Sequence, residues 1–239
     1  MRVEPPSPSR PLPVTVIRAL SLLLRLLLVG LPWILAEGCA SSVNDCLAEM
    51  QYGDPDSVRA ATIEVGELIS QKELAGYPLD EGDREAIALL RDLAGKNHDS
   101  ILRACAVSSL GRLTSPDSMD VFLQALQDNS TMWVVRLEAA KAIAAHPAPT
   151  AAGPLVKQME DEQRLEVRLE ILKALRAVGG MESLKILLKV FLDNSTRFRN
   201  MKLATYEAIC ALSGKTFALE DSASWKKYYD ELSTSGKSG

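Results

Sequence analysis

The sequence predicts an all-α protein, organised as a solenoid of about five stacked helix hairpins. The central observation is an internal repeat, because residues 164–179 reproduce residues 131–146 with Arg168 aligned on Arg136 and the same residue type at most positions. Composition agrees, since the 239 residues are 24% charged and only 5% aromatic, which suits a helical chain rich in Leu and Ala. A single domain accounts for this length.

The repeat extends beyond these two segments. Further copies lie at residues 58–66, 102–110 and 201–209. The steps between the aligned bases are 44, 33, 32 and 34 residues, which is the period of paired-helix repeats. A single hairpin of this kind cannot bury its apolar side, so the copies are expected to stack on one another.

Apolar periodicity places the two helices of each hairpin. First helices are predicted at residues 43–51, 84–95, 116–127, 151–160 and 181–192, and second helices lie around the five copies, the earliest over residues 57–70. Residues 71–82 contain Pro and Gly without an apolar period, and we predict a looped insertion that causes the 44-residue step. Gly66 stands where other copies have Leu or Ile, so the first hairpin is interpreted as an imperfect end cap.

The chain divides into four segments. We assign residues 1–38 to a signal peptide, 39–53 to an N-terminal tether and first helix, 54–213 to the repeat solenoid, and 214–239 to a C-terminal aromatic capping tail. Residues 1–25 contain four Arg and one acid, and residues 26–36 are an uncharged run of 11. This order is typical of an exported protein, and the run is too short to span a bilayer. An uncleaved signal anchor is the alternative.

Cys39 follows the apolar run, directly after Gly38. The pair resembles a bacterial lipobox, in which the Cys becomes the lipidated N-terminus, although Ala36 and Glu37 replace the Leu and the small residue that lipoboxes prefer. The resemblance implies lipidation of Cys39 and a membrane-anchored lipoprotein of the bacterial cell envelope, on its periplasmic or extracellular face. Ordinary cleavage without a lipid and an inert Cys in a linker are the alternatives.

Charge and residue content argue against several classes of function. The first 38 residues hold four Arg and two Glu, which leaves 23 basic against 29 acidic residues, so a nucleic-acid partner is not expected. His98 and His146 lie 48 residues apart, and Cys46, Cys105 and Cys210 lack a metal-ligand spacing. We therefore expect no metal, no cofactor and no enzymatic activity.

The aligned columns predict how the helices pack. Positions one, five and eight of each copy fall within roughly 60° of one another around a helix, so they share the packed side, on which Ile63 and Tyr206 are also expected. Position one holds a base in every copy, and we call this set the base ladder: Arg59, Arg103, Arg136, Arg168 and Lys202. Buried bases need partners. The candidates are turn acids: Asp99, Asp128, Asp161 and Asp193. A ligand site is the alternative to a structural ladder.

The repeat residues resemble a known family. A turn Asp followed by V-R-x-x-A-x-x-x-L, at a step of ~33 residues, is similar to HEAT repeats over residues 54–212. The resemblance implies a right-handed, armadillo-like α-solenoid with a binding role, whose second helices line a concave face. The end of the chain resembles the tail of bacterial HEAT proteins, and we interpret Phe217, Trp225 and Tyr229 as a cap over the last hairpin. An aromatic ligand site is the alternative.

A mixed-charge set of side chains falls on the side of the second helices away from the packed positions. We call it the charged strip: Arg112, Glu138, Lys141, Glu170, Lys173 and Glu207. By the family resemblance this strip is where a protein partner is expected. Its polarity predicts an electrostatically selected contact and not an apolar peptide groove, and a merely solvated surface is the alternative.

These observations favour a non-catalytic, monomeric scaffold or adaptor that binds another protein while a lipid holds it at the cell envelope. Two other interpretations stay open. One is an accessory or lyase-like HEAT protein that binds a small cofactor or assists an enzyme, and the other is a structural spacer.

Overall fold

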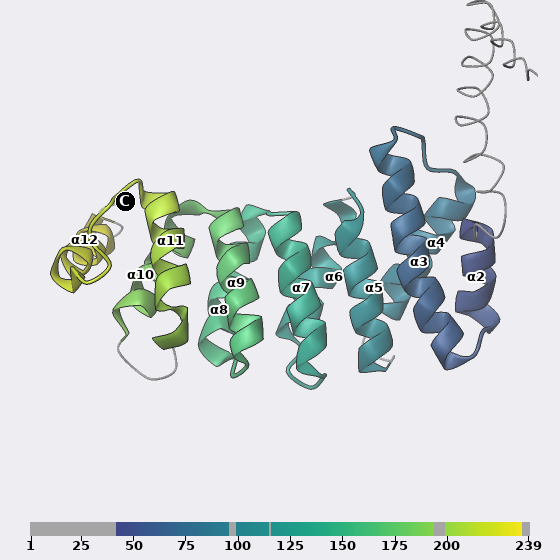
Figure 1. Cartoon of the computed structure of the whole chain (residues 1–239), viewed down its shortest axis with the longest axis horizontal. Helices are drawn as coiled ribbons and strands as arrows, with labels where there is room; N and C mark the ends of the chain where they lie inside the picture. The colour runs from purple at the N-terminus through teal and green to yellow at the C-terminus, as the bar shows by residue number, and fades with distance from the viewer. Residues whose placement is uncertain (1–41, 96–98, 115, 194–198, 236–239) are drawn as a thin grey trace, which may run out of the picture. The chain divides into compact units, whose positions relative to one another are not determined.

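The computed structural model describes residues 42–95, 99–114, 116–193 and 199–235. Within these ranges every regular element is a helix, and the helices form five hairpins stacked in a row, which confirms the predicted all-α solenoid (Figure 1). The predicted signal peptide and the predicted lipidation site at Cys39 lie outside the described residues. Among the helices that are described, none combines the length and the apolar content needed to cross a membrane.

Each hairpin pairs a first helix with a second helix. The first helices are α2 (Val43–Tyr52), α4 (Glu81–Leu93), α6 (Met119–Gln127), α8 (Ala152–Asp161) and α10 (Gly180–Leu192). The second helices are α3 (Pro55–Leu74), α5 (Ser100–Arg112), α7 (Trp133–Ala145), α9 (Leu165–Val178) and α11 (Lys202–Ser213). Short 3₁₀ turns, η1 (Pro116–Ser118), η2 (Pro149–Ala151) and η3 (Arg199–Met201), precede α6, α8 and α11. The second helices lie side by side in one layer (Figure 1).

Side-chain caps begin the early helices. Ser42 and Asp45 form a capping box at the start of α2, and Asp80 and Asp83 form another at the start of α4. Asp54 accepts hydrogen bonds from the first N–H groups of α3, whose first residue is a proline with its φ angle already suited to a helix. These caps satisfy N–H groups that have no partner within their own helix.

Helix α3 is longer than the other second helices, and this corrects the predicted loop at residues 71–82. It has 20 residues against 13 in α5 and α7, and it continues as a helix to Leu74. Gly76, at φ 76°, ends the helix in a left-handed turn, where the Tyr77 N–H bonds to the Lys72 carbonyl. The 44-residue step therefore comes largely from extra helix and only partly from a loop.

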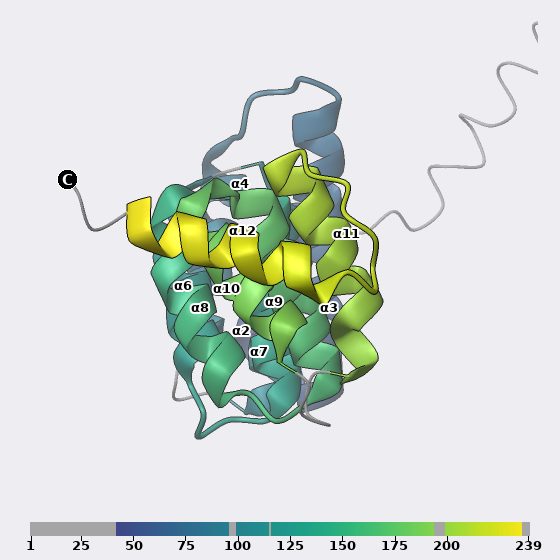
Figure 2. The ribbon, with the colours of Figure 1, turned by 90° about the vertical axis from the view of Figure 1, so that its left-hand side faces the viewer.

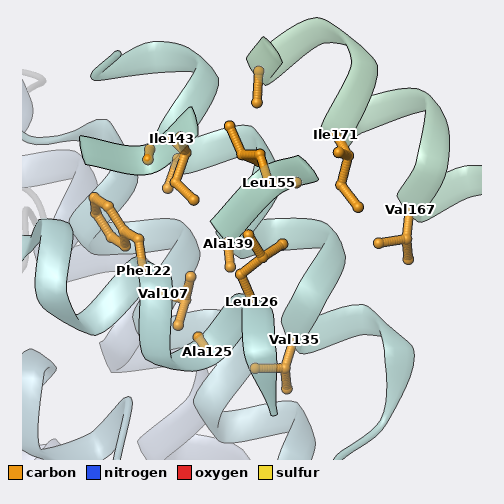
Figure 3. Packing of buried hydrophobic residues seen from close by; sticks show 14 of the residues in the cluster. Val107, Phe122, Ala125, Leu126, Val135, Ala139, Ile143, Leu155, Val167 and Ile171 are labelled. Carbon is orange, nitrogen blue, oxygen red and sulfur yellow. The ribbon is translucent and has the colours of Figure 1, made fainter. Parts of the chain in front are cut away.

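The core lies between the two helices of each hairpin and between successive hairpins. Val107 of α5, Phe122 and Leu126 of α6, and Ile143 of α7 are all almost fully buried and point toward one another (Figure 3). Ala139 of α7 fills the narrow space between larger side chains. Close packing of this kind fixes the spacing between neighbouring hairpins.

Gly66 has a structural role that differs from the predicted imperfect cap. A Cβ atom at this position would lie 2.6 Å from Ser109 Cβ on α5, so α3 and α5 approach closely only because residue 66 is a glycine. Ser109 Oγ donates a hydrogen bond of 2.7 Å to the Thr62 carbonyl at the same crossing. Val65 and Ile69 of α3 are fully buried beside it.

The predicted packed columns are only partly right. The eighth position is buried in α5, α7, α9 and α11, at Leu110, Ile143, Leu175 and Ile209. In contrast, Ile63 at the fifth position is 39% exposed, and Tyr206 is half-buried. Ile63 faces small side chains of α5, among them Ala104 and Ser108, which leave it partly uncovered.

The end of the described chain covers the last hairpin. Helix α12 (Ser222–Ser235) lies across the end of the stack (Figure 2) and packs against α10. Trp225 is fully buried there, with its ring 4.9 Å from Phe217 and 5.9 Å from Phe191 between centroids, and its indole N–H donates to the Ala218 carbonyl. Tyr229 is partly buried against the same core. The aromatic residues of the tail thus shield apolar surface of α10 and α11, where Trp225 meets Phe191 and Tyr206.

Candidate functional site

Two rungs of the base ladder are buried ion pairs that connect successive hairpins. Arg103 of α5 is 3% exposed, and its Nη1 donates a hydrogen bond of 3.0 Å to Asp128, in the turn between α6 and α7. Ser130 donates from its backbone N–H and its hydroxyl to the same carboxylate. The Ser130 hydroxyl, together with Arg103, holds the pKa of Asp128 below its usual value.

Arg136 has a different partner from the predicted Asp161. Its Nε and Nη2 donate to the two carboxylate oxygens of Glu162, at 2.7 and 3.3 Å, in a bidentate pair. Asp161 is the exposed last residue of α8, whereas Glu162 turns inward after the helix ends. Burial raises the pKa of Glu162, but Arg136 and the backbone N–H groups of residues 163 and 164 outweigh burial, so the pKa lies below its usual value.

The remaining members of the ladder have local partners. Arg168 is buried, and its Nη2 donates to the Gln163 carbonyl at 3.1 Å. At the two ends of the stack, Arg59 pairs with Asp56 of its own helix, and Lys202 lies 5.5 Å from the centre of the Phe191 ring. Asp99 was a predicted partner for a ladder base. Its carboxylate instead caps α5, where it accepts hydrogen bonds from the N–H groups of Ile101 and Leu102. The buried bases therefore connect turns and successive hairpins, which favours the structural ladder over a ligand site.

The charged strip lies on the outward side of α5, α7, α9 and α11. Glu138 pairs with Lys141, and Glu170 pairs with Lys173, each at 2.7 Å and three residues apart on one helix. Arg112 pairs with Glu67 of α3. Exposed pairs of this kind contribute only about 0.2–0.5 kcal/mol, so a partner protein can rearrange them at little cost.

An apolar groove crosses the N-terminal part of this strip, contrary to the predicted absence of such a groove. We call it the α5 groove, because α5 forms its floor between α3 and α7. Its volume is about 310 Å³. The lining residues are Ile63, Ile101, Ala104, Cys105, Ser108, Ser109, Arg112, Val134, Leu137 and Glu138. Two residues of the charged strip, Arg112 and Glu138, thus border an apolar hollow.

Small side chains on α5 account for the groove. At three aligned positions α5 carries Ala104, Cys105 and Ser108, where α7 carries Leu137, Glu138 and Lys141 and α9 carries Leu169, Glu170 and Lys173. The missing volume on α5 leaves Ile63 and Ile101 exposed by 39% and 41% at its edges. A column-by-column comparison of side-chain size could have revealed this hollow, whereas the comparison of residue type missed it.

The lining of the groove includes one thiol, that of Cys105. Burial raises the pKa of the Cys105 thiol, so the thiol stays protonated at neutral pH and is a poor nucleophile. In the described parts of the chain, no three side chains of His, Cys, Asp or Glu are gathered as metal ligands. Predicted strip members Glu170, Lys173 and Glu207 lie further along the stack and do not line this groove.

Comparison with protein families agrees with the architecture described above. HEAT repeats match residues 43–134 and 120–205, which together cover more than half of the chain. A search of curated proteins finds no match. Stacked hairpins, a buried base in successive second helices and the family match lead to one conclusion: the chain belongs to the HEAT-repeat family.

Proposed function

We propose that this protein is a non-catalytic scaffold, exported and held at a bacterial membrane by a lipid on Cys39, which binds a partner protein in the α5 groove. HEAT repeats generally serve as protein-interaction scaffolds. The observation that carries the proposal is the groove itself, an apolar hollow bordered by Arg112 and Glu138 on the second-helix layer. An apolar centre within a charged border is the usual anatomy of a protein-binding patch.

The dimensions of the groove indicate what the partner presents. A volume of about 310 Å³ is at the lower limit of small-molecule pockets and suits one or two large apolar side chains. Arg112 lies at one edge and Glu138 at another, so the anchoring side chain should be flanked by groups of opposite charge to each. The partner is therefore a peptide segment or helix with an apolar anchor between an acid and a base.

The binding site can be tested by filling the groove with larger side chains. The chosen side chains are those that other second helices of this protein carry at the aligned positions. The combined variant Ala104→Leu, Cys105→Glu and Ser108→Lys gives α5 the side chains that α7 and α9 carry at the same positions. The introduced acid and base are spaced like Glu138 and Lys141, so they can form the same pair. We expect an unchanged helical circular dichroism spectrum and loss of the protein that crosslinks to and co-purifies with the wild-type chain.

A matched control uses the equivalent pair one repeat further on. Reversing both Glu170 and Lys173 keeps their mutual attraction and lies away from the groove lining. This control should retain the partner, whereas reversing Glu138 alone should weaken its capture. Capture that survives groove filling but is lost in the Glu170 and Lys173 control would place the contact outside the groove and contradict the proposed site.

The membrane part of the proposal has its own test. Wild-type protein should fractionate with membranes and carry acyl chains, and Cys39→Ser should abolish both properties. Membrane association that persists in Cys39→Ser would instead favour an uncleaved signal anchor, because that anchor does not depend on the thiol.

The groove is also just large enough for a small molecule, at about 310 Å³. A second candidate function is therefore that of an accessory protein that binds a small cofactor. A ligand that binds only the folded state raises the melting temperature, and the rise grows with the logarithm of the ligand concentration once that concentration exceeds Kd. A screen of small apolar ligands by thermal melting separates the two functions, since the scaffold is not expected to respond to any of them.

A further inference from the structure

The α3–α4 tip, which we define as residues 74–79, exposes large apolar side chains at the end of the first hairpin. Leu74 is 80% exposed and Tyr77 is 67% exposed. Because α3 is longer than the other second helices, the tip extends beyond the end of α5 (Figure 1). Nothing in the core or in the α5 groove requires these two side chains to point outward.

Internal hydrogen bonds satisfy part of the backbone of the tip. The N–H groups of Ala75, Gly76 and Tyr77 each bond to a carbonyl of the last turns of α3, and Pro78 has no N–H. The Leu79 carbonyl accepts a hydrogen bond of 2.8 Å from Arg84. These bonds lower the cost of moving the tip toward a bilayer, and the remaining carbonyls of the tip need a depth at which water still reaches them, which is the interfacial region.

The tip lies at the end of the hairpin where the preceding chain is attached. Lys72 near the end of α3 pairs with Asp80 and Asp83 at the start of α4, each at 2.6 Å. The start of α4 in turn lies against the first turn of α2, since a Cβ at Gly82 would be 2.7 Å from Asn44 Oδ1. Ser42, the N-cap of α2, is therefore at the same end as Leu74 and Tyr77.

Chain length limits how far this end can be from a lipid on Cys39. Cys39 precedes Ser42 by three residues, and three extended residues span at most about 11 Å. An acylated Cys39 would thus hold the first hairpin against the surface of the bilayer. A solenoid tied at one point could still turn about that point, and an apolar tip beside the point of attachment would restrict this rotation.

We propose that the α3–α4 tip contacts the lipid bilayer, with Leu74 and Tyr77 entering the interfacial region as a second point of attachment. This inference rests on the proposed lipid anchor at Cys39. Tyrosine is enriched at this depth in membrane proteins, because its ring is apolar and its hydroxyl can stay hydrated. The two attachments together limit how the second-helix layer, and with it the α5 groove, can turn relative to the membrane.

The charges near the tip indicate whether the contact depends on anionic lipid. The ammonium group of Lys72 is neutralised by Asp80 and Asp83, and the Glu73 carboxylate accepts a hydrogen bond from the Thr114 N–H. The tip therefore offers no cluster of unpaired bases to anionic headgroups. The contact should depend on Leu74 and Tyr77 and not on the content of phosphatidylglycerol.

A tryptophan reporter tests the contact in the mature protein that carries acyl chains on Cys39. Tyr77→Trp is compared with Tyr52→Trp, a matched control, because Tyr52 is 86% exposed at the opposite end of α2. Both proteins are reconstituted into phosphatidylcholine vesicles with or without brominated acyl chains, which quench a nearby indole. The two tryptophans that follow Cys39, Trp133 and Trp225, are common to both variants, so their emission does not affect the comparison.

We expect brominated lipid to quench Tyr77→Trp and shift its emission to shorter wavelength, with no added quenching of Tyr52→Trp and no effect of phosphatidylglycerol. Equal emission from the two variants, in samples where the protein floats with the vesicles, would overturn the tip contact and leave the anchor intact. Protein that does not float with the vesicles, and whose Cys39 carries no acyl group, would overturn the anchor and the tip contact together.

Discussion

Arg103 Nη1 on α5 lies 3.0 Å from Asp128 Oδ2, although the two residues belong to successive hairpins. Both side chains are almost fully buried, at 3% and 6% exposure. Arg103 Nε also donates to the Ala94 carbonyl at the end of α4, so one guanidinium connects the second helix of its hairpin, the first helix of the same hairpin and the turn of the next. This ion pair therefore adds a buried electrostatic link to the apolar packing that joins the two repeats.

Removal of the carboxylate should therefore be costly. Asp128→Ala leaves the buried guanidinium of Arg103 without its main partner, and we expect the free energy of unfolding to fall by about 3–5 kcal/mol. Asp120→Ala is the control, because Asp120 is 72% exposed opposite Arg91 and its loss should cost about 1 kcal/mol or less. Urea unfolding followed by circular dichroism measures both. A cost for Asp128→Ala no greater than that of the control would refute the structural role of this rung.

The pH dependence of stability should follow the carboxylates of the ladder. The pKa values of Asp128 and Glu162 are both lower in the folded protein than the ordinary values of about 3.9 and about 4.3. A group whose pKa is lowered by folding stabilises the protein above its unfolded pKa, and this contribution is lost as pH falls through the folded pKa. We therefore expect an unfolding midpoint that is nearly constant from about pH 7 to about pH 5 and falls below about pH 4.

Glu162→Gln isolates one of these contributions. The variant should melt below the wild type at neutral pH, because Arg136 loses its bidentate partner, and it should lose less stability on acidification, because one titrating group is gone. Thermal melts between neutral and acidic pH provide the measurement. Parallel curves for variant and wild type would show that Glu162 titrates normally in the folded state.

The glycines at helix crossings should be intolerant of a methyl group. Gly66→Ala and Gly111→Ala would place a Cβ 2.6 Å from Ser109 Cβ and 2.8 Å from Ala142 Cβ, and we expect losses of about 1–3 kcal/mol in unfolding free energy. Gly153→Ala is the matched control, since its Cβ would meet only Glu182 Oε1 at 3.8 Å. The control should be neutral or stabilising by about 0.4–1 kcal/mol. If all three variants behaved alike, close helix approach would not be the reason for these glycines.

The aromatic cap should stabilise the last hairpin. Trp225→Ala removes a fully buried indole from between α12 and α10, and we expect a cost of about 3–5 kcal/mol. Faster amide hydrogen exchange should appear first in α10 and α11, because terminal repeats unfold most readily once they are uncovered. Lys226→Ala, on the exposed side of α12, should leave exchange unchanged. Exchange that increases evenly along all five hairpins would argue against a local cap.

Several features of this protein could be predicted from the order of residues alone. The repeat of Arg103, Arg136 and Arg168 at steps near one hairpin length predicts both the helix pairs and the burial of these bases. The reason is that a helix places residues three, four and seven apart on one side, so a periodic apolar pattern specifies which face is packed. Local signals such as Asp54 with Pro55 likewise mark where a helix begins.

Contacts between different hairpins were decided by the tertiary structure. Asp161 and Glu162 are adjacent acids, and only the way α8 ends directs Glu162 rather than Asp161 toward Arg136. The α5 groove likewise depends on three helices, since small side chains such as Cys105 leave a hollow only when Ile63 and Leu137 stand on either side. Periodicity along one helix determines its faces, whereas the shape of a surface shared by several helices depends on distances that no single helix contains.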